Sequence, residues 1–273
     1  MTLEKKSKQD RIVVYNALKG LPTQSDLRYL LVDQTIDCIR IKNVIPNDIA
    51  TTLSKNAINN SREHDRIENL SITGNTHYHI SHNNKEADKN FDSVEAFSEW
   101  VQQNSGGSQP LEKIIKLFAT MHEQGIHPAV LNKNNNHEVP QAIFRVYDAR
   151  NSPEILPHQD IIQWDIDTPE AKALDAQAGW NLYLDIPTQG GELLIYDNSI
   201  EKTEYEELAG DSYGIPWGIA GKAAQKISPE IGELIIIDTR RLHAIKTVSG
   251  EGYRVTLSGF LGYSENRGLI SWA

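Results

Sequence analysis

The second half of the chain consists of short runs of strand-forming residues, and this pattern constrains the fold more than any other feature of the sequence. The runs follow a polar loop at residues 132–136 and are separated by glycine, proline and asparagine. They lie at residues 142–147, 181–186, 192–196, 233–237 and 254–261. Short strands at this spacing are typical of an antiparallel sandwich or barrel. We therefore expect a mainly β core in this half of the chain.

The first half differs, because its apolar residues recur at helical spacing. Val94, Phe97 and Val101, for example, fall on one side of a helix. We expect a helical lead-in, one strand and three further helices at residues 1–34, 35–42, 48–66, 93–103 and 111–124. The whole fold is then mainly β with flanking helices, in the α+β class. We expect residues 1–130 to form a helical region that packs on a core formed by residues 131–273 and does not fold independently.

One long segment interrupts the β-rich half. Residues 198–226 contain four glycines and a proline, namely Gly210, Gly214, Pro216, Gly218 and Gly221. Segments of this length without regular structure are often binding loops or lids. We expect a lid-like insertion beside the site, and the alternative is an ordinary surface insertion.

Composition and charge limit the partners of the chain. Of its 273 residues, 39% are hydrophobic and 23% are charged, which is ordinary for a globular protein. The formal net charge of −10 argues against the basic surface that a nucleic acid or an anionic membrane would need. No apolar run is long enough to span a membrane, and the first ten residues lack the apolar region of a signal peptide. We expect a cytoplasmic protein with neither nucleic acid nor membrane as a partner.

The one cysteine, Cys38, excludes an intramolecular disulfide. It lies in an alternating segment at residues 35–41, which is typical of a strand. We therefore interpret Cys38 as a small core residue rather than a nucleophile.

The residues that indicate chemistry are His158, Asp160, His243 and Arg254. Residues i and i+2 of a strand point to the same face, so His158 and Asp160 can reach one metal ion from one edge. His243 follows an apolar run at residues 232–238 and would approach from a neighbouring strand. Two histidines and one carboxylate on one face of a metal are the ligand set of non-haem Fe(II) oxygenases. The guanidinium of Arg254 is a natural partner for a co-substrate carboxylate.

A His-x-Asp pair alone is weak evidence for a metal site. With nine histidines and 37 acidic residues, roughly one such pair is expected by chance. The surrounding elements add specificity, because a Gly190-Gly191 turn and a buried strand precede His243. The alternatives are a solvated loop histidine at position 158, a core histidine at 243 and a surface ion pair at Arg254.

Other histidines and the tryptophans are weaker candidates. His77, His79 and His82 could indicate a second metal site, but a polar loop with at most one residue facing the substrate is the favoured interpretation. Large aromatic residues more often pack in a core than line a pocket, and this applies to Trp164, Trp180 and Trp217.

Taken in order, five elements of the β-rich half resemble the Fe(II)/2-oxoglutarate-dependent oxygenase superfamily, most closely its prolyl-hydroxylase-like branch. They lie at residues 142–147, 156–160, 190–192, 232–243 and 254–256. The segment 258–264 and Trp272 also resemble, more loosely, the standalone aliphatic halogenases that act on hapalindole-type alkaloids. The first resemblance covers a little under half of the chain.

The resemblance implies a double-stranded β-helix core, a jelly roll of the cupin-like kind, with Fe(II) at its open end. It assigns His158, Asp160 and His243 to the metal and to catalysis, Arg254 to the distal carboxylate of 2-oxoglutarate, and Thr256 to a supporting hydroxyl. O2 is the second co-substrate, and succinate and CO2 are released. The alkaloid halogenases have glycine where this chain has Asp160, and that vacancy admits chloride. The resemblance therefore favours hydroxylation of an unactivated C–H bond in a small molecule, such as an amino acid or a natural-product scaffold.

Three competing interpretations stay open at this point. The same iron site could give desaturation, epoxidation, cyclisation or halogenation. The substrate could be a protein side chain. The chain could also be a jelly-roll module that binds a ligand without turnover, although such a module has no need of a 2-oxoglutarate anchor.

Overall fold

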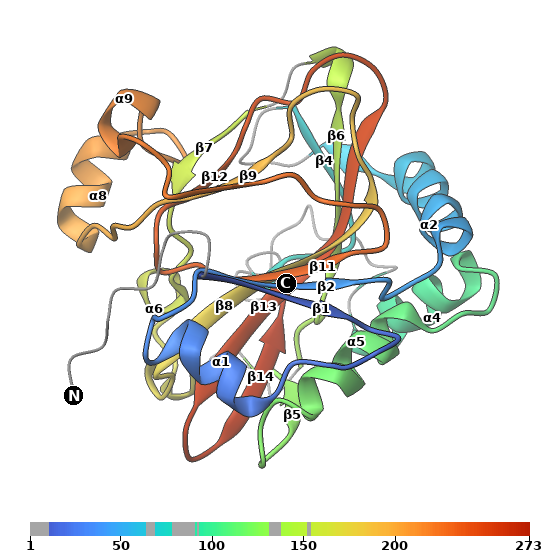
Figure 1. Cartoon of the computed structure of the whole chain (residues 1–273), viewed down its shortest axis with the longest axis horizontal. Helices are drawn as coiled ribbons and strands as arrows, with labels where there is room; N and C mark the ends of the chain where they lie inside the picture. Colours follow the sequence, from blue (N-terminus) through green and yellow to red (C-terminus); the bar gives the residue numbers. More distant parts are fainter. Residues whose placement is uncertain (1–10, 64–68, 78–90, 92, 131–137, 152–153) are drawn as a thin grey trace.

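The strands of the chain form two sheets that pack against each other (Figure 1). The computed structural model describes residues 11–63, 69–77, 91, 93–130, 138–151 and 154–273. Within these residues the larger sheet has ten strands, in the order β1 (Ile12–Asn16), β2 (Cys38–Lys42), β11 (Leu234–Asp238), β8 (Ala176–Asp185), β13 (Tyr253–Ser264), β6 (Ile143–Asp148), β4 (Leu70–Thr73) and β3 (Arg62–Glu63), with β14 (Gly268–Trp272) paired to β13 and β5 (Ile126–Pro128) paired to β14. The smaller sheet has four, in the order β10 (Gln225–Ile227), β9 (Leu193–Ile195), β12 (His243–Ile245) and β7 (Ile155–His158). This pair of sheets is the expected double-stranded β-helix.

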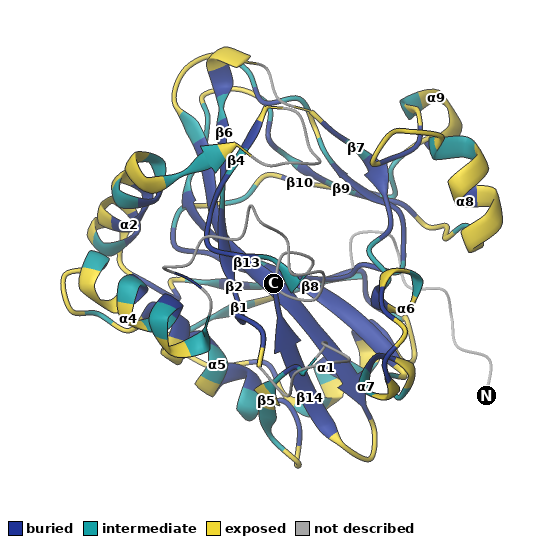
Figure 2. Ribbon diagram, turned by 180° about the vertical axis from the view of Figure 1, so that it is seen from behind, coloured by how far each residue is buried: buried dark blue, intermediate teal, exposed yellow. Residues whose placement is uncertain are grey.

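Helices cover the outer face of the larger sheet. They are α1 (Gln24–Leu31), α2 (Asn47–Asn60), α4 (Val94–Asn104) and α5 (Pro110–Ala119). Their apolar sides pack on outward-facing strand residues in one large buried cluster, which includes Trp180 and Leu257. Figure 2 shows the result, with exposed residues on the outer sides of these helices and buried residues along the strands.

The remaining helices lie near the smaller sheet or at the end of the larger one (Figure 1). They are the 3-10 turn Ala149–Asn151, α6 (Ile162–Asp165), α7 (Pro169–Lys172), α8 (Lys202–Ala209) and α9 (Trp217–Ala220). Both α8 and α9 fall within residues 198–226. None of the helices that the structure describes has the length and apolar character needed to cross a membrane.

Strand β13 shows how the sequence separates packing from chemistry. Side chains alternate along a strand, and Val255 and Leu257 lie in the cluster beneath the helices. Arg254, Thr256 and Ser258 alternate with them and therefore face the interior of the roll. All five are buried, so the polar side chains are enclosed rather than solvated.

The expected strands of the second half are all present, but two expectations for the first half were wrong. Residues 1–34 are not a wholly helical lead-in, because Ile12–Asn16 is a strand that pairs in parallel with β2. Its Ile-Val-Val-Tyr run favours a strand. The helix expected at 48–66 ends at Asn60, where Ser61 turns to an extended conformation and leads into β3.

Candidate metal centre and co-substrate pocket

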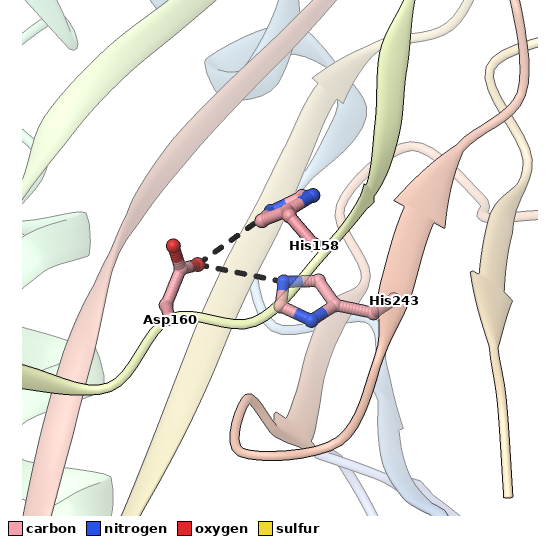
Figure 3. Close-up of side chains that lie close together, drawn as sticks. All are labelled: His158, Asp160 and His243. Carbon is pink, nitrogen blue, oxygen red and sulfur yellow. Dashed lines mark ion pairs between the residues drawn. The ribbon is translucent and has the colours of Figure 1, made fainter. Parts of the chain in front are cut away.

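The short strands β7 and β12 bring together two histidines from distant parts of the chain. His158 ends β7 and His243 begins β12, and the antiparallel register places them opposite each other. Asp160 Oδ2 lies 3.7 Å from His158 Nε2 and 3.4 Å from His243 Nε2 (Figure 3). One ligand atom from each of the three residues lies within 4.8 Å of the other two. A single metal ion can therefore contact all three.

Backbone carbonyls fix which imidazole nitrogen faces that position. His158 Nδ1 lies 2.7 Å from Leu156 O, and His243 Nδ1 lies 3.0 Å from Arg241 O. A carbonyl oxygen can only accept a hydrogen bond, so these partners assign the proton to Nδ1 in both rings. Each Nε2 then keeps its lone pair, as in histidines that bind metals.

The charge states of His158 and Asp160 also suit a metal. Burial, reinforced by the ring of His243, lowers the pKa of His158 to about 4. This imidazole is therefore neutral near pH 7, which is the form that binds a metal. Burial raises the pKa of Asp160, but the two histidines and the hydroxyl of Tyr213 outweigh burial and hold that pKa below its usual range. Asp160 is accordingly an ionised carboxylate.

The backbone around Asp160 is held in place by hydrogen bonds from neighbouring elements. Asp160 N donates to Thr239 O at 3.0 Å, and Gln177 Nε2 donates to Asp160 O at 2.8 Å. The side chain of Gln159 accepts from Ile200 N at 2.7 Å. These hydrogen bonds hold the backbone of Asp160 in place, although Asp160 lies two residues beyond the end of β7.

Arg254 is 1% exposed and forms no ion pair with any residue that the structure describes. Its Cζ lies 5.1 Å from the ring centroid of Tyr147 and 5.0 Å from that of Tyr183. Nη2 donates to Tyr183 Oη at 3.2 Å, while Nε and Nη1 are buried without a hydrogen-bond partner. An unpaired buried cation is costly. This pocket therefore suits an anionic ligand.

Thr256 lies two residues after Arg254 and on the same face of β13. Its Oγ1 is also buried without a hydrogen-bond partner. A small cavity of about 70 Å³ connects Arg254 to the three candidate metal ligands. The unpaired donors, the cavity and the ligand atoms together fit a metal-bound dicarboxylate.

Tyr213 is a site residue that sequence reasoning missed. Its hydroxyl donates to Asp160 Oδ1 at 2.6 Å, and its ring centroid lies 4.8 Å from that of His158. Tyr213 belongs to residues 198–226, whose glycines indicated a binding loop but did not indicate which side chain faces the site. A lone tyrosine in a loop has no sequence signal that links it to Asp160.

The segment that carries Tyr213 is fastened to β7. Tyr205 Oη donates to Tyr213 O at 2.7 Å, and Ile215 N donates to Pro157 O at 2.8 Å. Between them, a Cβ added to Gly214 would lie 2.8 Å from Pro157 O, which is closer than real Cβ atoms approach. Glycine at 214 therefore permits the close approach that places Tyr213 over the site.

Asp160 also lines a larger cavity of about 300 Å³. Residues of α8 and the loop after it form part of its wall, as do aromatic and charged side chains that include Trp164, Phe260 and Arg145. Trp180 instead packs beneath the helices, and Trp217 packs with the α8–α9 cluster. Of the three tryptophans, Trp164 is the one that lines this cavity.

Two residues of the N-terminal half also line this cavity. They are Thr76 and His77, whereas the N-terminal helices lie on the outer face of the larger sheet. His77 Nδ1 lies 3.0 Å from Ala273 O. His79 and His82 lie outside the described residues.

Comparison with known proteins identifies the family. A family model described as "Carrier-protein-independent halogenase WelO5" matches residues 23–272. The chain belongs to this family. A search of curated protein sequences found no match.

Solved structures agree on the fold of this family member. An N-substituted L-amino acid dioxygenase from Burkholderia ambifaria AMMD is 18% identical, with a TM-score of 0.57 over 92% of this chain and 91% of that one. HygX from Streptomyces hygroscopicus, solved with nickel and 2-oxoglutarate, is 10% identical, with a TM-score of 0.50 over 89% of this chain and 88% of that one. At these identities the likeness shows the fold alone.

The family match confirms the superfamily suggested by the sequence, and it covers far more of the chain than the five motifs did. The WelO5-type halogenases are Fe(II)/2-oxoglutarate enzymes, so this chain is an iron- and 2-oxoglutarate-dependent oxygenase. The looser of the two resemblances found in the sequence, to the standalone alkaloid halogenases, is the one that corresponds to this family. The donor set of His158, Asp160 and His243, together with unpaired Arg254, fits both cofactors.

Proposed function

We propose that this chain hydroxylates an unactivated C–H bond of a small molecule, although its family is named for halogenation. The observation that supports this proposal is Asp160, whose carboxylate lies beside the two histidine Nε2 atoms. Three protein ligands occupy three adjacent positions on a metal. A halogenase must give one of these to a halide, and a carboxylate held there excludes it.

In this proposal His158 Nε2, His243 Nε2 and Asp160 Oδ2 hold Fe(II). Arg254 pairs with the distal carboxylate of 2-oxoglutarate through Nε and Nη1, the two donors that now lack partners. Thr256 Oγ1 donates to the same co-substrate. The bound iron supplies O2-dependent C–H oxidation coupled to conversion of 2-oxoglutarate into succinate and CO2.

The other residues position and enclose these groups. Tyr213 donates to Asp160 Oδ1, whereas the two histidines lie close to Oδ2, so Oδ2 is the carboxylate oxygen left for a metal ion. Residues between 202 and 213 form part of the wall of the larger cavity, where this segment would limit the access of water to a bound substrate. We propose that this segment is the lid expected from its glycines.

Halogenation is the second candidate function, because the family match favours it. The two reactions differ in halide requirement and in product mass. A hydroxylase adds one oxygen atom with or without chloride, whereas a halogenase replaces one hydrogen with chlorine only when chloride is present.

The proposal is tested by loading the protein with Fe(II) and 2-oxoglutarate and screening a library of amino acids and other metabolites for succinate release. Active mixtures are then run in chloride buffer and in chloride-free buffer, and the product masses are measured by mass spectrometry. We expect a gain of one oxygen atom in both buffers. A chlorinated product from the wild-type chain would overturn the proposal.

Asp160→Gly provides the matched variant, because it creates the vacancy found in the alkaloid halogenases. We expect hydroxylation by this variant to be lost. Asp33→Gly, the same change at an exposed bend after α1 and remote from the site, is the control and should leave the reaction unchanged. Hydroxylation at the wild-type rate by Asp160→Gly would show that Asp160 is not a ligand.

A further inference from the structure

A second arginine, Arg145, lies inside the roll close to the candidate metal centre. It is on β6, directly opposite Thr256 of β13 in the antiparallel register. Tyr147, two residues further along β6, faces Arg254 in the same way. Arg145 and Arg254 therefore lie on neighbouring strands and on the same interior face of the sheet. Arg254 is two residues from Thr256, the residue opposite Arg145.

Arg145 has few partners for a charged side chain at this depth. Nη1 donates to Ser258 Oγ, and Cζ lies 5.9 Å from the ring centroid of Phe260. No carboxylate of the described residues lies within ion-pair distance of its guanidinium. Other partly buried arginines differ, since Arg40 pairs with Glu233 at 2.7 Å and Arg240 pairs with Asp238 at 2.6 Å.

The position of Arg145 between two cavities indicates what it serves. It lines both the small cavity that holds the candidate metal ligands and the larger cavity of about 300 Å³. Its guanidinium is therefore open to a molecule that lies beside the metal centre. A partly buried cation without a counter-ion is costly, and an anionic ligand would offset that cost.

We propose that Arg145 binds a carboxylate of the substrate, so that the substrate is a small monocarboxylic acid. This inference rests on the proposed function, in which 2-oxoglutarate already uses both of its ends. Its distal carboxylate would pair with Arg254, and its other end would be held at the metal centre of His158, Asp160 and His243. The free guanidinium at Arg145 is then left for the substrate.

The other charges of the larger cavity select a singly charged acid. Asp160, Asp165 and Glu206 line it together with Arg145. Lys202 lines it as well, but its ammonium already pairs with Glu206 at 3.7 Å. These carboxylates disfavour a dianion such as a phosphate monoester. A planar carboxylate matches the guanidinium fork with two parallel hydrogen bonds, while Phe260 and Trp164 can pack against the apolar part of the acid.

The test uses protein loaded with Mn(II) in place of Fe(II), and with 2-oxoglutarate. Mn(II) broadens the proton NMR lines of any molecule held close to it, including weak ligands. The probes are a set of N-acetyl-L-amino acids and the matched C-terminal amides, which lack the carboxylate. We expect wild-type protein to broaden acids more strongly than their amides, by about tenfold for the best acid.

Two substitutions make the test specific for the guanidinium. Arg145→Gln should lose the preference for acids, and Arg145→Lys should keep part of it, because a lysine retains charge but not the fork. Arg267→Gln, the same change at an exposed turn, should behave as wild type.

A separate measurement distinguishes failure of this inference from failure of the proposed function. The visible band that forms when 2-oxoglutarate binds Fe(II) under anaerobic conditions should saturate at the same 2-oxoglutarate concentration in wild type and Arg145→Gln. If the variant needs far more 2-oxoglutarate, Arg145 serves the co-substrate and the inference is wrong. Equal broadening of acids and amides by the wild type, or no broadening of any acid, also overturns it. Absence of the band in wild type would overturn the proposed function as well.

Discussion

Two buried arginines, Arg241 and Arg254, differ in how fully their guanidinium groups are paired. Arg241 contacts Asp37 and donates to Tyr196 O at 2.9 Å, and Asp37 also receives Arg11 Nη2 at 2.6 Å. Arg254 is at least as buried, yet two of its nitrogens have no partner. Arg254 lies on β13 and Arg241 in the turn between β11 and β12, but both are buried, so depth alone does not explain the difference.

We infer that Arg241 has a structural role, whereas Arg254 is available to bind an anionic ligand. A satisfied buried pair contributes little net stability, but breaking it leaves an uncompensated charge. An unsatisfied buried charge already carries that cost in the ligand-free protein. We therefore expect substitutions in these two regions to have opposite consequences for stability.

The largest expected effect comes from making Arg241 resemble Arg254. Asp37→Asn keeps the side-chain shape and removes the negative charge, so Arg241 loses its buried ion pair and keeps only the half-exposed Asp197 at 3.2 Å. We expect the free energy of unfolding to fall by about 3–5 kcal/mol, measured by urea denaturation. An unchanged midpoint would show that the pair is not structural.

Arg28→Gln is the control for that measurement. Arg28 pairs with Glu265 at 2.7 Å, but both side chains are exposed. Exposed pairs contribute little to stability, so this variant should unfold like the wild type.

The next effect is at Arg254 itself. Arg254→Met keeps most of the volume and removes the unpaired cation, so the ligand-free protein should be as stable as wild type or more stable. Its affinity for 2-oxoglutarate should fall by about 2–4 kcal/mol, measured by calorimetry on the metal-loaded protein. A variant that unfolds more easily and binds 2-oxoglutarate normally would reverse the roles assigned to the two arginines.

A smaller effect is expected at Tyr213, which links the insertion to the metal centre. Tyr213→Phe removes the hydrogen bond to Asp160 and keeps the ring beside His158. We expect metal affinity to fall about 10–100-fold, measured by competition with a chelator. Tyr29→Phe, at an exposed tyrosine of α1, should leave metal affinity unchanged.

The smallest effect is expected at Thr256. Its hydroxyl has no partner in the ligand-free protein, so Thr256→Val should not lower the free energy of unfolding. The affinity for 2-oxoglutarate should fall by about 0.5–1.5 kcal/mol, the usual contribution of one hydrogen bond. An unchanged affinity in the same calorimetric titration would remove Thr256 from the co-substrate pocket.

The sequence could predict the β-rich core and the three candidate metal ligands for local reasons. His158 and Asp160 are two residues apart, and His243 follows a buried strand, so short-range patterns mark all three. Their convergence needed only that β7 and β12 be neighbours, which the jelly roll supplies.

The rest of the site depends on contacts that no local pattern encodes. Arg145 matters because the register sets it opposite Thr256, and a shift of one residue would turn it away from the interior. Tyr213 matters because its loop folds back onto β7. Strand β1 had a local signal in its Ile-Val-Val-Tyr run, but its pairing with β2 lies across α1 and no five-residue pattern encodes it.

The most direct test of the central claim is an anaerobic titration of the Fe(II)-loaded protein with 2-oxoglutarate, followed by the visible charge-transfer band. We predict a saturable band in wild type, and a band of the same final intensity in Arg254→Met at a 2-oxoglutarate concentration about thirtyfold to a thousandfold higher. Absence of the band in wild type, or superimposable curves for the two proteins, would contradict the account.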